Sequence, residues 1–104
     1  MDSSRCTFWS RSLLVAVLLA TAACQTAPVQ EMSDARQAIT VAKEAGAAEY
    51  ATVELKAAED FLMTAERSLF QRDYALARDS AMQAKVEALN ALKVSDANRD
   101  SDGP

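Results

Sequence analysis

Cys24 is the residue of this chain whose type and setting point most directly to a chemical reaction. It follows the small residues 21–23, which follow an apolar run over residues 13–20, and Arg5 and Arg11 precede that run. A basic segment, a short apolar segment and small residues, in this order, are typical of a secretion signal. A cysteine directly after the small residues completes a lipobox, in which the thiol receives a diacylglycerol. The sequence therefore predicts a signal peptide over residues 1–23 and a lipidated N-terminus at Cys24.

Two other interpretations of this segment compete with the lipobox. The run from 13 to 24 is twelve residues long, whereas a membrane-spanning helix needs about 20 apolar residues, which argues against a spanning anchor. A plain secretory signal cleaved after Ala23 is the main alternative, because Ala-x-Ala-like sites are common. The segment resembles bacterial lipoprotein signals, although Thr21 stands where those signals usually have Leu.

The resemblance to lipoprotein signals implies a location. Such a chain carries a diacylglycerol thioether and an N-acyl chain such as palmitate, and two or three acyl chains anchor a protein stably where one does not. In lipoproteins of Gram-negative bacteria, an Asp after the cysteine tends to retain the protein in the inner membrane. Gln25 occupies that position here. The expected location is the periplasmic face of the outer membrane.

The remaining residues offer little for catalysis. The chain has no His, and Cys6 lies in the predicted signal. No Gly-rich loop and no nucleophile–base pair is recognisable, so we expect no enzyme, no catalytic residue, no cofactor and no metal site. Glu59, Glu66 and Asp73 recur every seven residues, but hard cations need convergent oxygen ligands, so this pattern favours a solvated helix face. A net charge of −4 without a basic cluster argues against nucleic acid as a partner.

The elements that would follow Cys24 are helices. The chain is rich in alanine and has only two Gly and two Pro, so the sequence predicts an all-α fold. The expected organisation is a tether, a helical domain over three helices, and a disordered tail. These are residues 24–32 for the tether, 33–95 for the domain and 96–104 for the tail. The first expected helix runs from the N-cap Ser33 to about Ala45, with Gly46 as the stop. The second begins near Thr52, which can cap it, and runs to about Gln71, and the third follows the N-cap Asp73 and runs to about Val94.

Each expected helix has an apolar stripe with alternating spacings of three and four residues. This heptad-like pattern, as in a coiled coil, indicates helices packed at shallow angles, and alanine in the stripe lets two backbones approach closely. The sequence therefore predicts an antiparallel helical hairpin or a small three-helix bundle with alanine-rich seams. A domain of this size buries little surface and is marginal alone, so self-association or a partner would help it.

The last helix has a second apolar stripe, formed by Met82, Val86 and Leu89. These residues lie roughly 120° from the alanine stripe of the same helix. Two interpretations remain open. The helix could contact one neighbouring helix through each stripe, or the second stripe could be a surface for a second copy or another envelope protein.

Several short segments carry a family resemblance. They are Asp34-Ala35-Arg36-Gln37-Ala38-Ile39, then Ala42 and Ala45-Gly46-Ala47 with Tyr50-Ala51, then Glu54-Leu55-Lys56-Ala57-Ala58, and Asp73-Tyr74-Ala75-Leu76-Ala77-Arg78. Together they resemble the small bacterial envelope lipoproteins grouped as domain of unknown function 4398, over about residues 33–94. Members often have Pro where this chain has Thr52. The resemblance implies a helical envelope lipoprotein and supplies no catalytic residues.

Three functions are compatible with these observations. The first is a structural or adaptor lipoprotein of the outer membrane that acts through helix–helix contacts. The second is a small protein whose helical groove binds a peptide, a lipid or a glycan. The third is an accessory subunit of an envelope enzyme or secretion complex. In the first and third, an envelope protein or a second copy is the expected partner.

Overall fold

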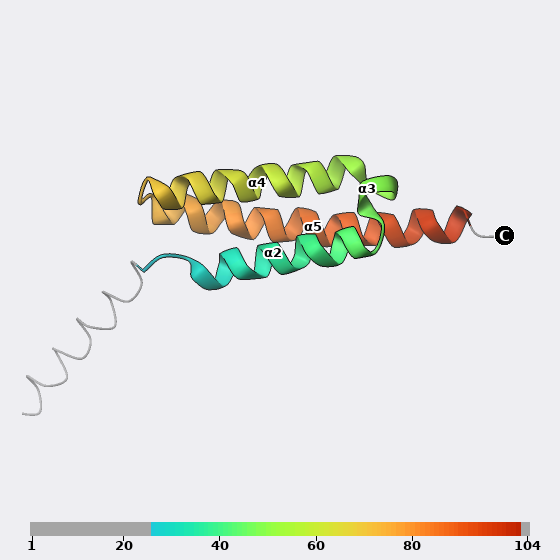
Figure 1. The fold of residues 1–104 in the computed structure, drawn as a ribbon, viewed down its shortest axis with the longest axis horizontal. Helices are drawn as coiled ribbons and strands as arrows, with labels where there is room; N and C mark the ends of the chain where they lie inside the picture. The colour runs from blue at the N-terminus through green and yellow to red at the C-terminus, as the bar shows by residue number, and fades with distance from the viewer. Residues whose placement is uncertain (1–25, 103–104) are drawn as a thin grey trace, which may run out of the picture.

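The computed structural model describes residues 26–102, which form helices joined by short turns without a strand in this range. Figure 1 shows α5 between α2 and α4, with α2 and α5 running in the same direction and α4 running in the opposite one. The fold is an all-α three-helix bundle, as the sequence predicts, and it has a short additional helix. Its elements are α2 (Val29–Glu44), α3 (Ala47–Tyr50), α4 (Thr52–Phe70) and α5 (Tyr74–Asp102).

Helix α2 begins earlier than the sequence predicts. Residues 29–32, assigned above to the tether, form its first turn, and Ser33 lies inside the helix. The backbone N–H of Met32 donates to the carbonyl of Pro28 at 3.0 Å. Met32 is 2% exposed and packs with Ala65 and Ala81. The early start therefore follows from burial of Met32, because the helical turn is what points this side chain into the bundle.

Gly46 ends α2, as predicted. Its φ of 91° is left-handed, a conformation that glycine adopts at little cost because it has no Cβ. The helix resumes at once as α3, a single turn that the sequence analysis did not anticipate. The aromatic ring of Tyr50, at the end of α3, lies close to Gly46, since a Cβ at position 46 would be 3.1 Å from Tyr50 Cδ2. The tight turn and the ring thus occupy one compact corner.

The turns before and after α4 are formed by residues close together in the sequence. Thr52 is the first residue of α4, but Ala51 is its N-cap and no side chain caps the helix, so the capping role predicted for Thr52 is wrong. At the other end, Asp73 does cap α5, because its Oδ1 accepts a hydrogen bond from the backbone N–H of Leu76 at 3.2 Å. Arg72, with φ of 62°, reverses the chain just before this cap.

Helix α5 is longer than predicted. The assignment of residues 96–104 to a disordered tail is wrong for residues 96–102. The helix continues to Asp102, so residues 96–102 are helical, and residues 103–104 lie outside the described range. Ser95 is fully buried, and Asn98 Nδ2 donates to the carbonyl oxygen of Tyr50 at 2.8 Å. No Gly or Pro interrupts α5 between Tyr74 and Asp102. The helix continues through this polar segment because the corner formed by α3 packs against it.

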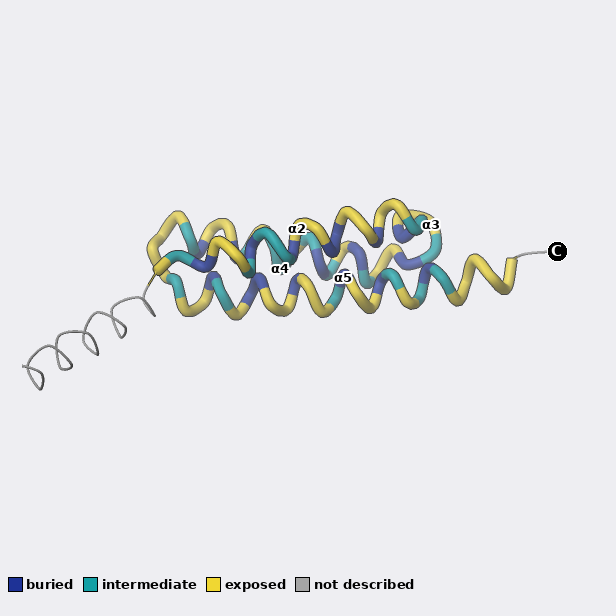
Figure 2. Tube along the Cα trace, turned by 90° about the horizontal axis from the view of Figure 1, so that it is seen from below, coloured by how far each residue is buried: buried dark blue, intermediate teal, exposed yellow. Residues whose placement is uncertain are grey.

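The core lies along one face of α5. Five alanines of this helix are fully buried, and they share the interior with residues from both neighbouring helices, including Ile39 of α2 and Leu55 of α4. Figure 2 shows the buried residues of α5 on its inner side and exposed residues along its outer side. The alanines are Ala77, Ala81, Ala84, Ala88 and Ala91. Among the described residues, no helix has both the length and the apolar character required to cross a membrane.

Candidate interaction surface

The second apolar stripe of α5 lies outside the bundle. Met82 is 55% exposed, Val86 63% and Leu89 45%. The interpretation that α5 contacts one neighbour through each stripe is therefore wrong for the part of the chain that the structure describes. Helices α2 and α4 both pack on the alanine face of α5, and they contact each other less than either contacts α5.

The small size of alanine explains this arrangement. A seam of Cβ methyl groups lets α5 sit deep in the groove between α2 and α4, so one face reaches two neighbours. Larger side chains at the same positions would hold the three backbones apart. The outer face of α5 is then left without a neighbour in the bundle, and its Met82–Val86–Leu89 stripe faces away from the core.

A shallow groove runs beside this stripe, between α5 and α2. Its volume is about 410 Å³, and besides the three stripe residues it is lined by Glu31, Asp34 and Lys85. On the other side of the stripe, a hollow of about 290 Å³ is lined by Val86, Glu87, Leu89, Asn90 and Lys93. The stripe is thus a low apolar ridge with a depression on each side and charged residues at the rims.

Ion pairs fix α2 beside this ridge. Arg78 Nε lies 3.4 Å from Glu31 Oε1, and Lys85 Nζ lies 3.9 Å from Asp34 Oδ2. Arg78 also donates to the backbone carbonyl of Thr26 at 3.1 Å. Partly exposed pairs of this kind contribute about 0–1 kcal/mol each. Their effect on the surface is to define its edge, since they hold the first turns of α2 along α5.

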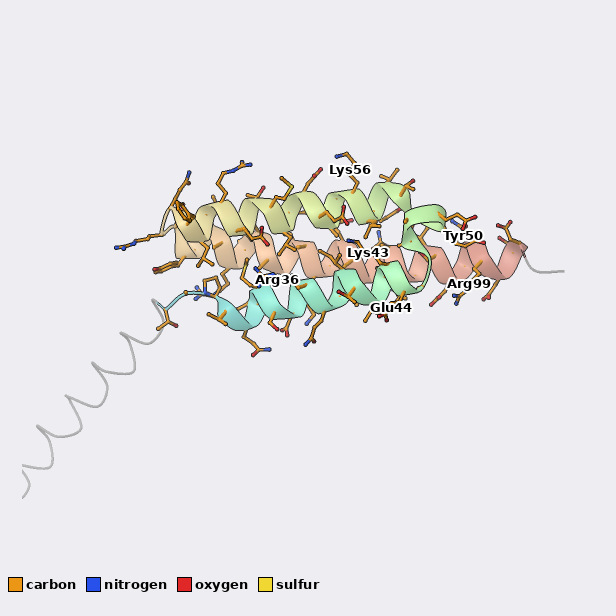
Figure 3. The ribbon with its side chains drawn as sticks, in the orientation of Figure 1. Arg36, Lys43, Glu44, Tyr50, Lys56 and Arg99 are labelled. Atoms are coloured by element: carbon orange, nitrogen blue, oxygen red, sulfur yellow. The ribbon has the colours of Figure 1, made fainter. Side chains whose placement is uncertain are left out.

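The acidic residues that recur every seven positions, Glu59, Glu66 and Asp73, contribute to other contacts. Glu59 Oε1 lies 2.9 Å from Lys43 Nζ, and Glu66 Oε1 lies 3.3 Å from Arg36 Nη2. Figure 3 shows Arg36 and Lys43 on α2. Asp73, the third residue of the pattern, is the N-cap of α5. In the part of the chain that the structure describes, no three His, Cys, Asp or Glu side chains gather closely enough to hold a metal ion. The heptad residues thus join α2 to α4 and cap α5.

The surface has two charged ends that the sequence analysis did not include. Asp79 lies seven residues before Val86 and Lys93 seven residues after it, and both side chains are exposed. They continue the spacing of three and four residues that defines the stripe. The spacing in the sequence could have identified both residues. Because they are charged, they do not belong to the apolar stripe, which begins at Met82 and ends at Leu89. Cys24, the predicted lipidation site, lies outside the described residues.

Comparison with known proteins assigns the chain to a family without giving it an activity. No curated protein and no solved structure matches it. A family model matches residues 30–102, a range that contains all of α3, α4 and α5 and nearly all of α2. The match includes the segments that carry the resemblance noted in the sequence. The chain belongs to the family described as Domain of unknown function (DUF4398).

Proposed function

We propose that this protein is a lipoprotein anchored in the outer membrane, facing the periplasm, that acts as a structural or adaptor protein through helix–helix contacts. The observation that carries the proposal is the exposed Met82–Val86–Leu89 stripe on the outer face of α5. Contiguous exposed apolar residues with a polar rim are typical of surfaces that bind another protein. The predicted lipid at Cys24 supports the location.

The amphipathic geometry favours a helical partner. The stripe follows the helix axis with spacings of three and four residues, which is the spacing of the residues that a second helix contacts when it packs alongside. The depressions on either side of the ridge leave room for the side chains of such a helix. A flat or irregular partner would leave these depressions unfilled.

A small-molecule or peptide binder is the second candidate, favoured by the groove of about 410 Å³ between α2 and α5. This volume lies within the range of about 300–1,000 Å³ that ligand pockets occupy. A ligand pocket, however, encloses most of its ligand, whereas this groove borders an exposed ridge. We therefore rank the helix–helix role first, and an accessory subunit of an envelope complex is one form of it.

Substitution of Val86 by Asp tests the proposal. Crosslinking and affinity capture of the tagged full chain from its native envelope should recover a defined protein partner, and Val86→Asp should abolish that capture. Far-ultraviolet circular dichroism should show unchanged helicity, because Val86 is 63% exposed. Val53→Asp is the matched control, since Val53 is 76% exposed in the first turn of α4, away from the stripe.

Three results would count against the proposal. Capture that survives Val86→Asp would exclude the stripe as the contact. Loss of folding in Val86→Asp would show that Val86 supports the bundle itself. A chain that copurifies with a small molecule and no protein would favour the binding role. The anchor is tested separately by mass spectrometry of the N-terminal peptide, where an unmodified Cys24 would refute the membrane location.

A further inference from the structure

The apolar stripe of α5 ends in opposite charges. Asp79 and Lys93 lie seven residues before and after Val86, so each is about 10.5 Å from Val86 along the axis and about 20° from its direction. Both side chains are exposed, and neither forms an ion pair with a described residue in the structure. Along the helix, the face therefore presents a carboxylate, three apolar side chains and an ammonium group.

This order of groups is complementary to itself in one orientation. If a second α5 packs antiparallel with a two-fold axis near Val86, Asp79 of each copy lies opposite Lys93 of the other copy. Met82 of one copy then lies level with Leu89 of the other, and the two Val86 side chains meet at the axis. In a parallel pair, Asp79 would face Asp79 and Lys93 would face Lys93, and like charges repel.

We propose that the partner of the stripe is a second copy of this chain, bound antiparallel through residues 79–93 of α5. The inference rests on the proposed function, because it names the occupant of the same surface. The contact is isologous, with the same patch on both copies, as in a two-fold symmetric dimer.

The residues around the stripe are compatible with this pairing. The two Lys85 side chains come to the same side of the axis, and each has Asp34 Oδ2 at 3.9 Å from its Nζ, so a carboxylate moderates their repulsion. The groove beside the stripe is bordered by Met82, Val86 and Leu89. It leaves space there for Leu89 of the other copy.

The size of the contact indicates where the dimer forms. Three apolar residues from each copy bury less than the roughly 1,200–2,000 Å² of a stable interface, so the free dimer is weak. Two chains anchored in one membrane have a higher effective concentration, which favours the pair. Arg78 of α5 donates to the carbonyl of Thr26, so Thr26, the first described residue, lies near the N-terminal end of α5. In an antiparallel pair the two Thr26 residues lie at opposite ends of the contact, and both lie near one membrane when α5 lies along its surface.

Cysteine crosslinking of the full chain in its native membranes tests both partner and orientation. Val86→Cys should form a disulfide-linked dimer under mild oxidation, because the two residues meet at the axis. Two differently tagged chains, one with Asp79→Cys and the other with Lys93→Cys, should crosslink when expressed together. Neither of these variants should crosslink when expressed alone. The unsubstituted chain under the same oxidation gives the background from Cys6 and Cys24.

Each other outcome overturns a defined part of the inference. Asp79→Cys or Lys93→Cys that dimerises alone, while the mixed pair does not, would establish a parallel contact. A photo-crosslinker at position 86 that captures a different protein and no second copy would overturn the dimer and leave the adaptor role standing. A photo-crosslinker at position 86 that captures no protein would overturn both proposals.

A charge exchange supplies a second readout that does not depend on new cysteines at the ends. In the Val86→Cys background, Asp79→Lys should lower the dimer yield about fivefold, because two surface ion pairs become two repulsive contacts. Adding Lys93→Asp to the same chain should restore the yield. The matched control is Asp60→Lys on α4, an exposed carboxylate away from the stripe, and its dimer yield should equal that of the parent. Failure of the double exchange to restore dimerisation would contradict the pairing of Asp79 with Lys93.

Discussion

Substitution of Gly46 by Ala should destabilise the bundle because the turn after α2 depends on a left-handed residue. Gly46 has a φ of 91°, and an L-residue in the left-handed region costs about 1–2 kcal/mol. The new Cβ would also lie 3.1 Å from Tyr50 Cδ2, which requires the ring to move by a few tenths of an ångström. The smaller conformational entropy of the unfolded chain with Ala offsets about 0.4–1 kcal/mol. These two backbone effects leave a loss of up to about 1.6 kcal/mol, and the displacement of the Tyr50 ring adds to it, so the expected net loss is about 1–2 kcal/mol.

Thermal unfolding of the full chain, followed by circular dichroism at the helix band, measures this loss. For a domain of this size, 1 kcal/mol corresponds to about 4–8 °C, so the Tm of Gly46→Ala should fall by about 5–15 °C. Gly46→Asn should lose less, because Asn tolerates the left-handed region better than Ala. A Tm that is unchanged or raised in Gly46→Ala would refute the left-handed turn.

A double-mutant cycle separates the two causes of the Gly46→Ala loss. In a Tyr50→Ala background the contact between the new Cβ and the ring is absent, so only the backbone cost at position 46 should remain. A penalty that is smaller in this background shows that the ring contributes through contact. An equal penalty would assign the whole effect to φ and would place the ring of Tyr50 away from Gly46 in solution.

Two further substitutions test the seam of α5. Ser95 Oγ is buried and has no hydrogen-bond partner among the described residues, so Ser95→Ala should raise the free energy of unfolding in urea by about 1–2 kcal/mol, and a loss of stability would show that the hydroxyl is bonded. Ala88 is fully buried in the seam, so Ala88→Leu should cost about 1–3 kcal/mol through overpacking. Ala97→Leu, at an exposed position of the same helix, should stay within about 0.5 kcal/mol, and equal effects at the two sites would contradict the seam.

The features predicted correctly are those decided by local chemistry. Gly46 ends α2 because the left-handed region selects glycine, and Asp73 caps α5 because its carboxylate reaches a free N–H nearby. The helical fold follows from abundant alanine and few breakers. In each case the residues that decide the outcome lie within a few positions of one another, so the sequence alone contains the information.

The features that were missed depend on contacts between distant segments. Met32 is part of the first turn of α2, where its side chain packs against Ala65 and Ala81. The C-terminal part of α5 is stabilised by Asn98, which donates a hydrogen bond to the carbonyl oxygen of Tyr50. Composition marked both ends as non-helical because it measures polarity and not these contacts. The sequence alone does not decide whether the Met82–Val86–Leu89 stripe is buried or exposed, for a similar reason. Helical periodicity gives the direction in which a side chain points, but not which helices lie in that direction.

The distribution of apolar side chains on α5 is the reverse of what stability alone would favour. The small alanines are inside the bundle, while Met82, Val86 and Leu89 remain substantially exposed. Full burial of a Val, Leu or Met side chain stabilises by about 1.5–3 kcal/mol, and about half of this gain is absent in the isolated bundle. Rotation of α5 cannot recover it, because the narrow groove between α2 and α4 admits methyl groups and not these larger side chains. Contact with another molecule can recover it, so the same seam that makes the bundle compact leaves α5 able to bind.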